Sequence, residues 1–116
     1  MTSVDYKSVK LEPYISPDAE RTGIRWLISE ADGAENYAMR MIQIEPGGHS
    51  PSHIHESEHE VFVWRGEGEV RLDDKHHRLS PGTVVFVPPG VDHQFLNTSD
   101  REQLEFICVV PIVKEK

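Results

Sequence analysis

Glycine and proline interrupt this chain at short intervals, and that spacing most constrains what it can fold into. The eight glycines and eight prolines divide the 116 residues into short segments. Within these segments apolar and polar side chains alternate with a period of two, most clearly at residues 68–72. No 12-residue window shows the 3.6-residue period of an amphipathic helix. The pattern predicts an all-β protein, either a sandwich or a barrel.

Five segments are predicted to be strands. They combine β-branched and aromatic residues with bounding turn signals, and they are residues 37–44, 60–64, 68–72, 83–87 and 104–110. The length suits one domain. We therefore expect a single domain over residues 1–116, with N-terminal strands within 4–30 and a barrel core at about 36–113.

Charge and cysteine content argue against several classes of protein. Twelve Lys and Arg against 20 Asp and Glu give a net charge of −8, which disfavours nucleic acid or an anionic membrane as a partner. The single cysteine cannot form an intrachain disulfide. Residues 1–6 lack the basic and apolar stretches of a signal peptide, and no apolar run approaches the length of a spanning helix. We expect a cytoplasmic protein that takes a small-molecule ligand.

Three of the seven histidines fall within seven residues. In an extended chain alternate side chains share a face, so His53, His55 and His59 point the same way, while Glu56, Glu58 and Glu60 point to the opposite side. Several imidazoles converging from a rigid scaffold are what a metal site requires. The alternative is a set of solvated surface histidines.

Two motifs resemble the signatures of the cupin superfamily. Gly47-x5-His53-x-His55-x3-His59-x6-Gly66 is similar to the first signature, and Gly82-x5-Pro88-x-Gly90-x2-His93-x3-Asn97 matches the fixed positions of the second. The resemblance implies a single cupin jelly-roll barrel, a double-stranded β-helix, in which the two motifs converge. It makes His93 the fourth member of the site and implies a homodimer.

The third ligand position departs from the pattern of many cupins, which place a glutamate there. The spacing to Gly66 and the strand parity both favour His59, and Glu60 is the alternative. The chain thus resembles the small four-histidine, manganese-type cupins. That resemblance implies one divalent metal ion per chain, with manganese first, whereas imidazole ligands also suit iron, zinc, nickel and copper.

Four further residues are candidates for the pocket: Cys108, Phe95, Phe106 and Arg40. Each has a structural alternative. Cys108 can be a buried thiol that behaves as a small hydrophobe, the phenylalanines can be plain core, and Arg40 can point outward to an acidic partner. We also expect Met39 and Met41 to line the pocket, and Glu105 to face outward.

The remaining histidines and aromatic residues are expected to have other roles. His49 is placed at the rim, and His76 and His77 in a solvated turn. Phe62 and Trp64 lie on the face opposite His59, where they pack under another segment or form a dimer surface. Asn97, Gly82, Pro88 and Gly90 are interpreted as structural, with Gly90 supplying a backbone φ that other residues avoid.

Three classes of function fit these features, because the fold alone does not determine the function. The first is a metal-dependent, dioxygenase-like oxidoreductase acting on a small organic substrate, with two coordination positions open on the metal. The second is a non-catalytic binding or sensing protein. The third is an isomerase or epimerase that uses the metal as a Lewis acid. The sequence favours the first class and leaves the other two open.

Overall fold

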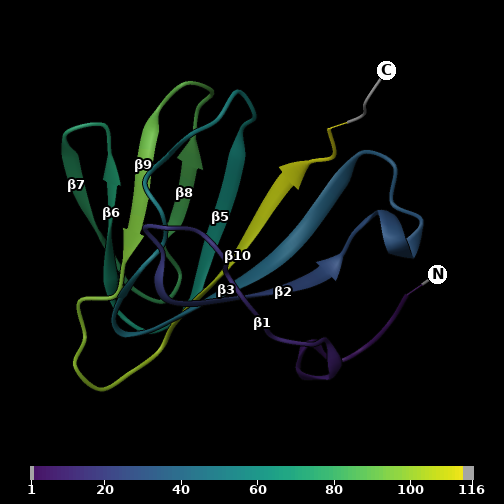
Figure 1. The fold of residues 1–116 in the computed structure, drawn as a ribbon, viewed down its shortest axis with the longest axis horizontal. Helices are drawn as coiled ribbons and strands as arrows, with labels where there is room; N and C mark the ends of the chain where they lie inside the picture. The colour runs from purple at the N-terminus through teal and green to yellow at the C-terminus, as the bar shows by residue number, and fades with distance from the viewer. Residues whose placement is uncertain (1, 114–116) are drawn as a thin grey trace.

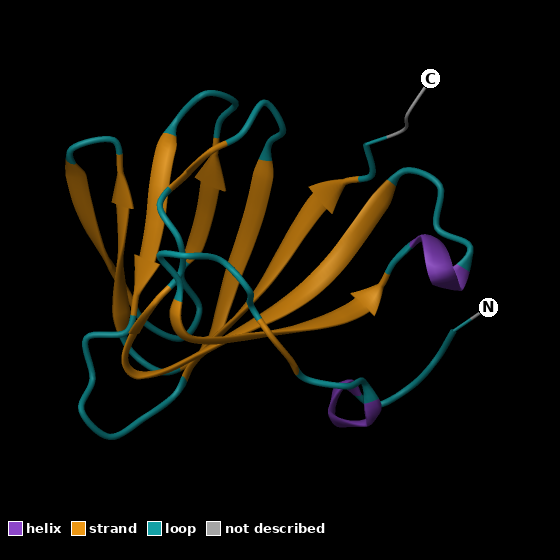
Figure 2. Ribbon diagram, in the orientation of Figure 1, coloured by secondary structure: helices purple, strands orange, loops and turns teal. Residues whose placement is uncertain are grey.

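The computed structural model describes residues 2–113, and ten strands of that region form one curled sheet (Figure 1). The strands are β1 (Glu12–Pro13), β2 (Glu20–Ile28), β3 (Tyr37–His49), β4 (His53–Ile54), β5 (His59–Arg65), β6 (Gly68–Leu72), β7 (Lys75–Leu79), β8 (Val84–Val87), β9 (Asp92–Leu96) and β10 (Leu104–Pro111). Two single-turn 3-10 helices, η1 (Tyr6–Ser8) and η2 (Glu30–Asp32), are the helical elements of the described region (Figure 2). The expected all-β class is confirmed.

The sheet curls into a half-barrel. Its strand order is β7-β6-β9-β3-β10-β5-β8, with β2 added beside β3, β1 beside β2, and β4 beside β9. All these pairs are antiparallel. The segment between β1 and β2 loops across the middle of the ribbon before β2 begins (Figure 1). Residue 1 and residues 114–116 of the expected domain lie outside the described part of the chain.

Alternation along β5 shows how the sequence separates the two faces of the sheet. His59, Val61 and Val63 are buried, whereas Phe62 and Trp64 are half-exposed on the other face. The buried face belongs to one hydrophobic core, which comprises Ile24, Ile42, Ile44, Val61, Val63, Val70, Leu79, Val87, Phe95, Leu104, Phe106 and Cys108. The inner face of the half-barrel is thus the core, and the candidate site lies on it.

Strand register places residues that are distant in the sequence in rows on this inner face. Trp26 on β2 is opposite Arg40 on β3, and Arg40 is opposite Cys108 on β10. In the same way Ile42 lies between Ile24 and Phe106. Directly opposed residues on one face lie within contact distance, so three separate segments supply one continuous surface.

One expectation about strand faces is corrected, and a second holds although the side chain is covered. Met39 and Met41 alternate with Arg40 along β3 and so belong to its other face; neither lines the pocket. Glu105 lies on the outer face but is only 3% exposed. It is covered because the Trp64 indole donates a hydrogen bond to its carboxylate at 2.9 Å.

Trp64 itself lies under the N-terminal segment. Its ring meets that of Tyr6 edge-on, with the centroids 6.2 Å apart. Of the two alternatives for this aromatic residue, packing beneath another segment is therefore observed. No helix within residues 2–113 has the length and apolar character needed to cross a membrane.

Candidate metal centre

The structure brings His53, His55, His59 and His93 together on the inner face. Their ring centroids lie 4.7 Å apart for His53 and His55, 4.9 Å for His55 and His59, and 5.3 Å for His59 and His93. His53 and His93 are directly opposed across the β4–β9 pair. His59 begins β5, and His55 lies in the link between β4 and β5. The two motifs thus meet from neighbouring strands.

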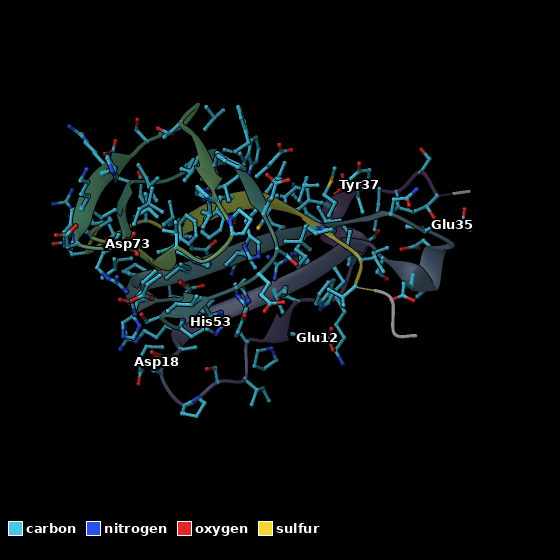
Figure 3. All side chains as sticks on the ribbon, turned by 90° about the horizontal axis from the view of Figure 1, so that it is seen from above. Glu12, Asp18, Glu35, Tyr37, His53 and Asp73 are labelled. Carbon is cyan, nitrogen blue, oxygen red and sulfur yellow. The ribbon has the colours of Figure 1, made fainter. Side chains whose placement is uncertain are left out.

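Hydrogen bonds hold the histidine segments in place. The backbone N–H of Gly90 donates to the carbonyl of His55 at 2.7 Å. Gly90 has a φ of +80°, which confirms the expected left-handed turn. The Ser52 hydroxyl donates a hydrogen bond to the Asp92 carboxylate at 2.9 Å. The backbone N–H of Ser52 donates a second hydrogen bond to the Asp18 carboxylate at 3.1 Å. Figure 3 accordingly shows His53 close to Asp18 and away from Tyr37.

Two ring nitrogens already have the separation of metal ligands. His55 Nε2 lies 3.0 Å from His53 Nδ1, which is about the spacing of two adjacent octahedral ligands each about 2.1 Å from an ion. His93 Nδ1 lies 3.0 Å from the carbonyl of Val91. Because a carbonyl only accepts, Nδ1 carries the proton and Nε2 keeps its lone pair for a ligand role.

The remaining rings are not yet arranged around a common point. Within the described residues, no group of three His, Cys, Asp or Glu side chains has the arrangement of a metal site. The four histidines therefore fit a metal ion by residue type and proximity, and binding one requires their rings to turn. The metal site stays a prediction.

Burial keeps three of these imidazoles neutral. It lowers the pKa of His59 to about 3, with a further contribution from the positive charge of Arg40. Burial is also the main cause that lowers the pKa of His55 and of His93. His59 and His93 are only 8% and 4% exposed. Neutral imidazole is the form that coordinates metals.

Arg40 and Cys108 lie beside the histidines. Arg40 Nη2 donates to Cys108 Sγ at 2.9 Å, and that sulfur lies 3.8 Å from His59 Nδ1. Burial raises the pKa of the Cys108 thiol, so it stays protonated near neutral pH. Arg40 therefore occupies the inner face, and the alternative in which it pairs outward with an acidic residue is wrong.

The cavity between these side chains has a volume of about 40 Å³. That is room for an ion and a water molecule, far below the size of a drug-like ligand. Its lining consists of Tyr14, Arg40, Ile42, Ser50, Pro51, His53, His55, His59, His93, Phe95, Phe106 and Cys108. The four histidines and the four pocket candidates Cys108, Phe95, Phe106 and Arg40 all belong to this set, whereas Met39 and Met41 do not. Phe95 and Phe106 stack with centroids 4.4 Å apart, and both also belong to the core.

Sequence reasoning missed four lining residues: Tyr14, Ile42, Ser50 and Pro51. Ile42 has a usable signal, because it shares the parity of Arg40, and Ser50 and Pro51 lie inside the first motif. Tyr14 has none, since it reaches the cavity only through the loop after β1.

The other histidines and Glu60 lie elsewhere. Glu60 is exposed on the other face of β5, opposite Val109 of β10, and does not line the cavity. His49 ends β3 and stands outside the cavity lining. His76 and His77 are exposed but lie in β7 and not in a turn; His76 Nδ1 is 2.9 Å from Glu69.

The family model described as "Cupin domain" matches residues 40–110. Protein SchB of Streptomyces halstedii is 36% identical over 91 residues, which are 76% of this chain and 66% of SchB. The 1-methylthio-D-xylulose 5-phosphate methylsulfurylase of Rhodospirillum rubrum is 31% identical over 78 residues, 67% of this chain and 49% of that enzyme. The chain thus spans less than two thirds of either relative.

A solved structure agrees over a longer stretch. The polyketide cyclase RemF from Streptomyces resistomycificus is 33% identical, with a TM-score of 0.89, over 96% of this chain and 79% of RemF. The strand order, the convergence of the two histidine motifs and the match over residues 40–110 have one explanation: this chain belongs to the cupin family.

Proposed function

We propose that this protein is a metal-dependent enzyme of the cyclase or isomerase type, acting on a small enolisable carbonyl compound. His53, His55, His59 and His93 would hold one divalent ion. When bound, such an ion acts as a Lewis acid that polarises a carbonyl oxygen. The proposal differs from the dioxygenase-like oxidoreductase that the sequence favours, which stays a prediction.

The observation that carries this proposal is the charge of the cavity. Its lining contains four histidines and one arginine, and none of the described lining residues is an aspartate or glutamate. Neutral imidazoles leave the positive charge of a divalent ion undiminished, and Arg40 adds another beside His59. A site of that charge stabilises negative charge developing on oxygen, as in an enolate.

The surrounding side chains strengthen this electrostatic effect. Phe95 and Phe106 are buried at 4% and 2% exposure and exclude water from one side of the histidines. In a water-poor site, charge interactions are stronger than in bulk solvent. The likeness to a polyketide cyclase supports enolate chemistry, because an aldol-type ring closure joins the α-carbon of one carbonyl group, deprotonated to its enolate, to the carbon of a second carbonyl group.

The first test is metal content. Elemental analysis is expected to find about one divalent metal ion per chain in the wild type. His53→Ala and His93→Ala are expected to lose it while keeping the circular dichroism spectrum of a folded protein. His77→Ala, at an exposed position on β7, is the matched control and should keep the metal. Full occupancy in both cavity variants would show that the ligand assignment is wrong.

The second test separates enolisation from oxidation. The zinc-loaded protein is expected to accelerate exchange of the α-hydrogen of acetoin for deuterium, followed by proton NMR, without consuming dioxygen. The metal-free protein serves as the control. The oxidoreductase would be favoured by two results together. The zinc-loaded protein would exchange the α-hydrogen no faster than the metal-free control, and the iron- or manganese-loaded protein would consume dioxygen.

A further inference from the structure

Arg40 borders two cavities on the inner face of the sheet. Beside the histidine cavity runs a groove of about 390 Å³, lined by Glu12, Pro13, Tyr14, Ile15, Ile24, Trp26 and Arg40. Tyr14 and Arg40 line both spaces. The groove has the size of a small-molecule site, whereas the histidine cavity, at about 40 Å³, does not. The histidine cavity is too small to enclose an organic ligand, and the groove that shares Tyr14 and Arg40 with it has room for the rest of such a molecule.

The guanidinium at this junction has unused hydrogen-bonding capacity. Arginine carries five N–H donors, and the Arg40 contact with Cys108 uses one of them. Its Nε is buried without a hydrogen-bond partner among the described residues. Within residues 2–113, no carboxylate forms a salt bridge with it. A cation partly removed from water without a counter-ion is costly, and an anionic ligand removes that cost.

The groove walls favour a flat apolar body. The Trp26 ring lies 5.6 Å from the guanidinium carbon of Arg40, which supports one face of that group. Ile24 belongs to the core, and Ile15 stands at the rim with 90% of its surface exposed. Glu12, exposed in β1, is the carboxylate of this lining. Figure 3 shows Glu12 on the same side of the molecule as His53.

We propose that the histidine cavity and this groove form one binding site for an anionic ligand with a planar, apolar body. Arg40 holds a carboxylate or enolate oxygen next to the histidines, and the body lies against Tyr14, Ile15 and Trp26. This inference rests on the proposed function for the role of the site, and it names the class of ligand. The contact with Arg40 does not itself require the metal.

The test uses the metal-free protein. The chain has two tryptophans, so Trp64→Phe leaves Trp26 as the sole fluorescent indole. In this background we expect 1-hydroxy-2-naphthoate to bind and quench Trp26. Arg40→Met should weaken that binding at least tenfold, and Arg40→Lys should weaken it less, because lysine keeps the charge but not the planar fork. Arg78→Met, at a side chain that is 80% exposed, is the matched control and should change nothing.

The neutral amide of the same probe distinguishes the contribution of the carboxylate charge to binding from that of the ring shape. Its affinity should change less than twofold in Arg40→Met. Ile15→Glu should weaken both probes at least threefold, since it places a charge at the apolar rim. Thermal melts establish that each variant is folded.

Three results would overturn the inference. The first is an equal affinity for naphthoate in Arg40→Met and in the wild type. The second is naphthoate binding that does not quench Trp26. The third is self-association of the chain that competes with the probe and is lost in Ile15→Glu. The last would mean that a second copy of the chain fills the groove. Metal content measured in parallel distinguishes failure of this inference from failure of the proposed function. A protein that binds metal but not naphthoate contradicts this inference alone. A protein that binds naphthoate but not metal contradicts the proposed function alone.

Discussion

At the scale of single residues, the site depends on polar groups that the fold buries without neutralising partners. His59 and His93 are almost fully buried, and each has one hydrogen-bonding contact to a neighbouring group: the Cys108 sulfur for His59 and the Val91 carbonyl for His93. Burial penalises a charged imidazole. Both rings therefore bind a proton less readily in the folded chain than in the unfolded chain.

This difference predicts how the stability of the metal-free protein depends on pH. The pKa of His59 is about 3 in the folded chain and near 6.5 when unfolded. Between these values the unfolded state binds more protons, so stability is fully present above pH 6.5 and falls as the pH is lowered. At pH 5 the loss from His59 is about 2 kcal/mol. Urea unfolding from pH 7.5 to 5 measures it.

Substitutions separate this effect from general acid destabilisation. His59→Gln should make the pH dependence shallower, because one of the groups that take up a proton on unfolding is gone, while His55 and His93 remain. His77→Gln, on the exposed strand β7, should leave the pH dependence as in the wild type. Identical slopes in all three proteins would assign the acid sensitivity to other groups.

At the scale of elements, the turns decide whether strands can approach each other. Gly66 follows β5 with a φ of +90°, and a Cβ there would lie 2.2 Å from the carbonyl oxygen of Gln103. Gly82 has a similar φ of +95°, but a Cβ would meet nothing within 4 Å. The two glycines thus share the left-handed conformation and differ in the space around them.

We predict that alanine at these two glycines lowers the unfolding free energy by different amounts. Gly82→Ala should lose about 1 kcal/mol of unfolding free energy, because alanine is strained at a positive φ. Gly66→Ala should lose at least twice as much, since its methyl group also clashes with the backbone before β10. Urea denaturation of both variants measures the difference. Equal losses would mean that the chain shifts freely at Gly66.

At the scale of the whole molecule, one apolar face stays uncovered. Strand β8 ends the strand order, and Val84 and Phe86 on it are 74% and 51% exposed. Phe62 on the adjacent β5 is 47% exposed and borders the same hollow. Sheet edges and apolar patches of this kind favour association. The homodimer that the family resemblance implies stays a prediction, and this face is where we expect it.

Light scattering after size-exclusion chromatography tests the dimer. The wild type is expected to have the mass of two chains, and Phe86→Lys that of one, because a lysine cannot be buried there without a partner. Tyr37→Lys is the control: Tyr37 is an exposed aromatic residue, 68% accessible, at the start of β3. A single-chain mass for the wild type, or an unchanged mass for Phe86→Lys, would contradict the expectation.

Local alternation explains which strands the sequence predicts. The predicted segments 60–64, 68–72 and 104–110 agree with β5, β6 and β10 to within one residue at each end. Strand β7 was missed because its first four residues are exposed and polar, so it carries no apolar signal. Strand β9 was not proposed as a strand, although two of its residues, His93 and Phe95, were named as members of the site and the pocket.

The sequence by itself determined the β class, the shared face of His53, His55 and His59, and the two motifs that mark the family. Each of these depends on spacing along one segment, and the period of a strand is a local property. Only the tertiary structure decided that Arg40 faces Cys108 and Trp26, that Tyr14 reaches the histidines, and that Glu105 is buried. Those contacts depend on how separate segments pair, as β3 does with β2 and with β10. Alternation along one strand determines its two faces but not which strands lie beside it.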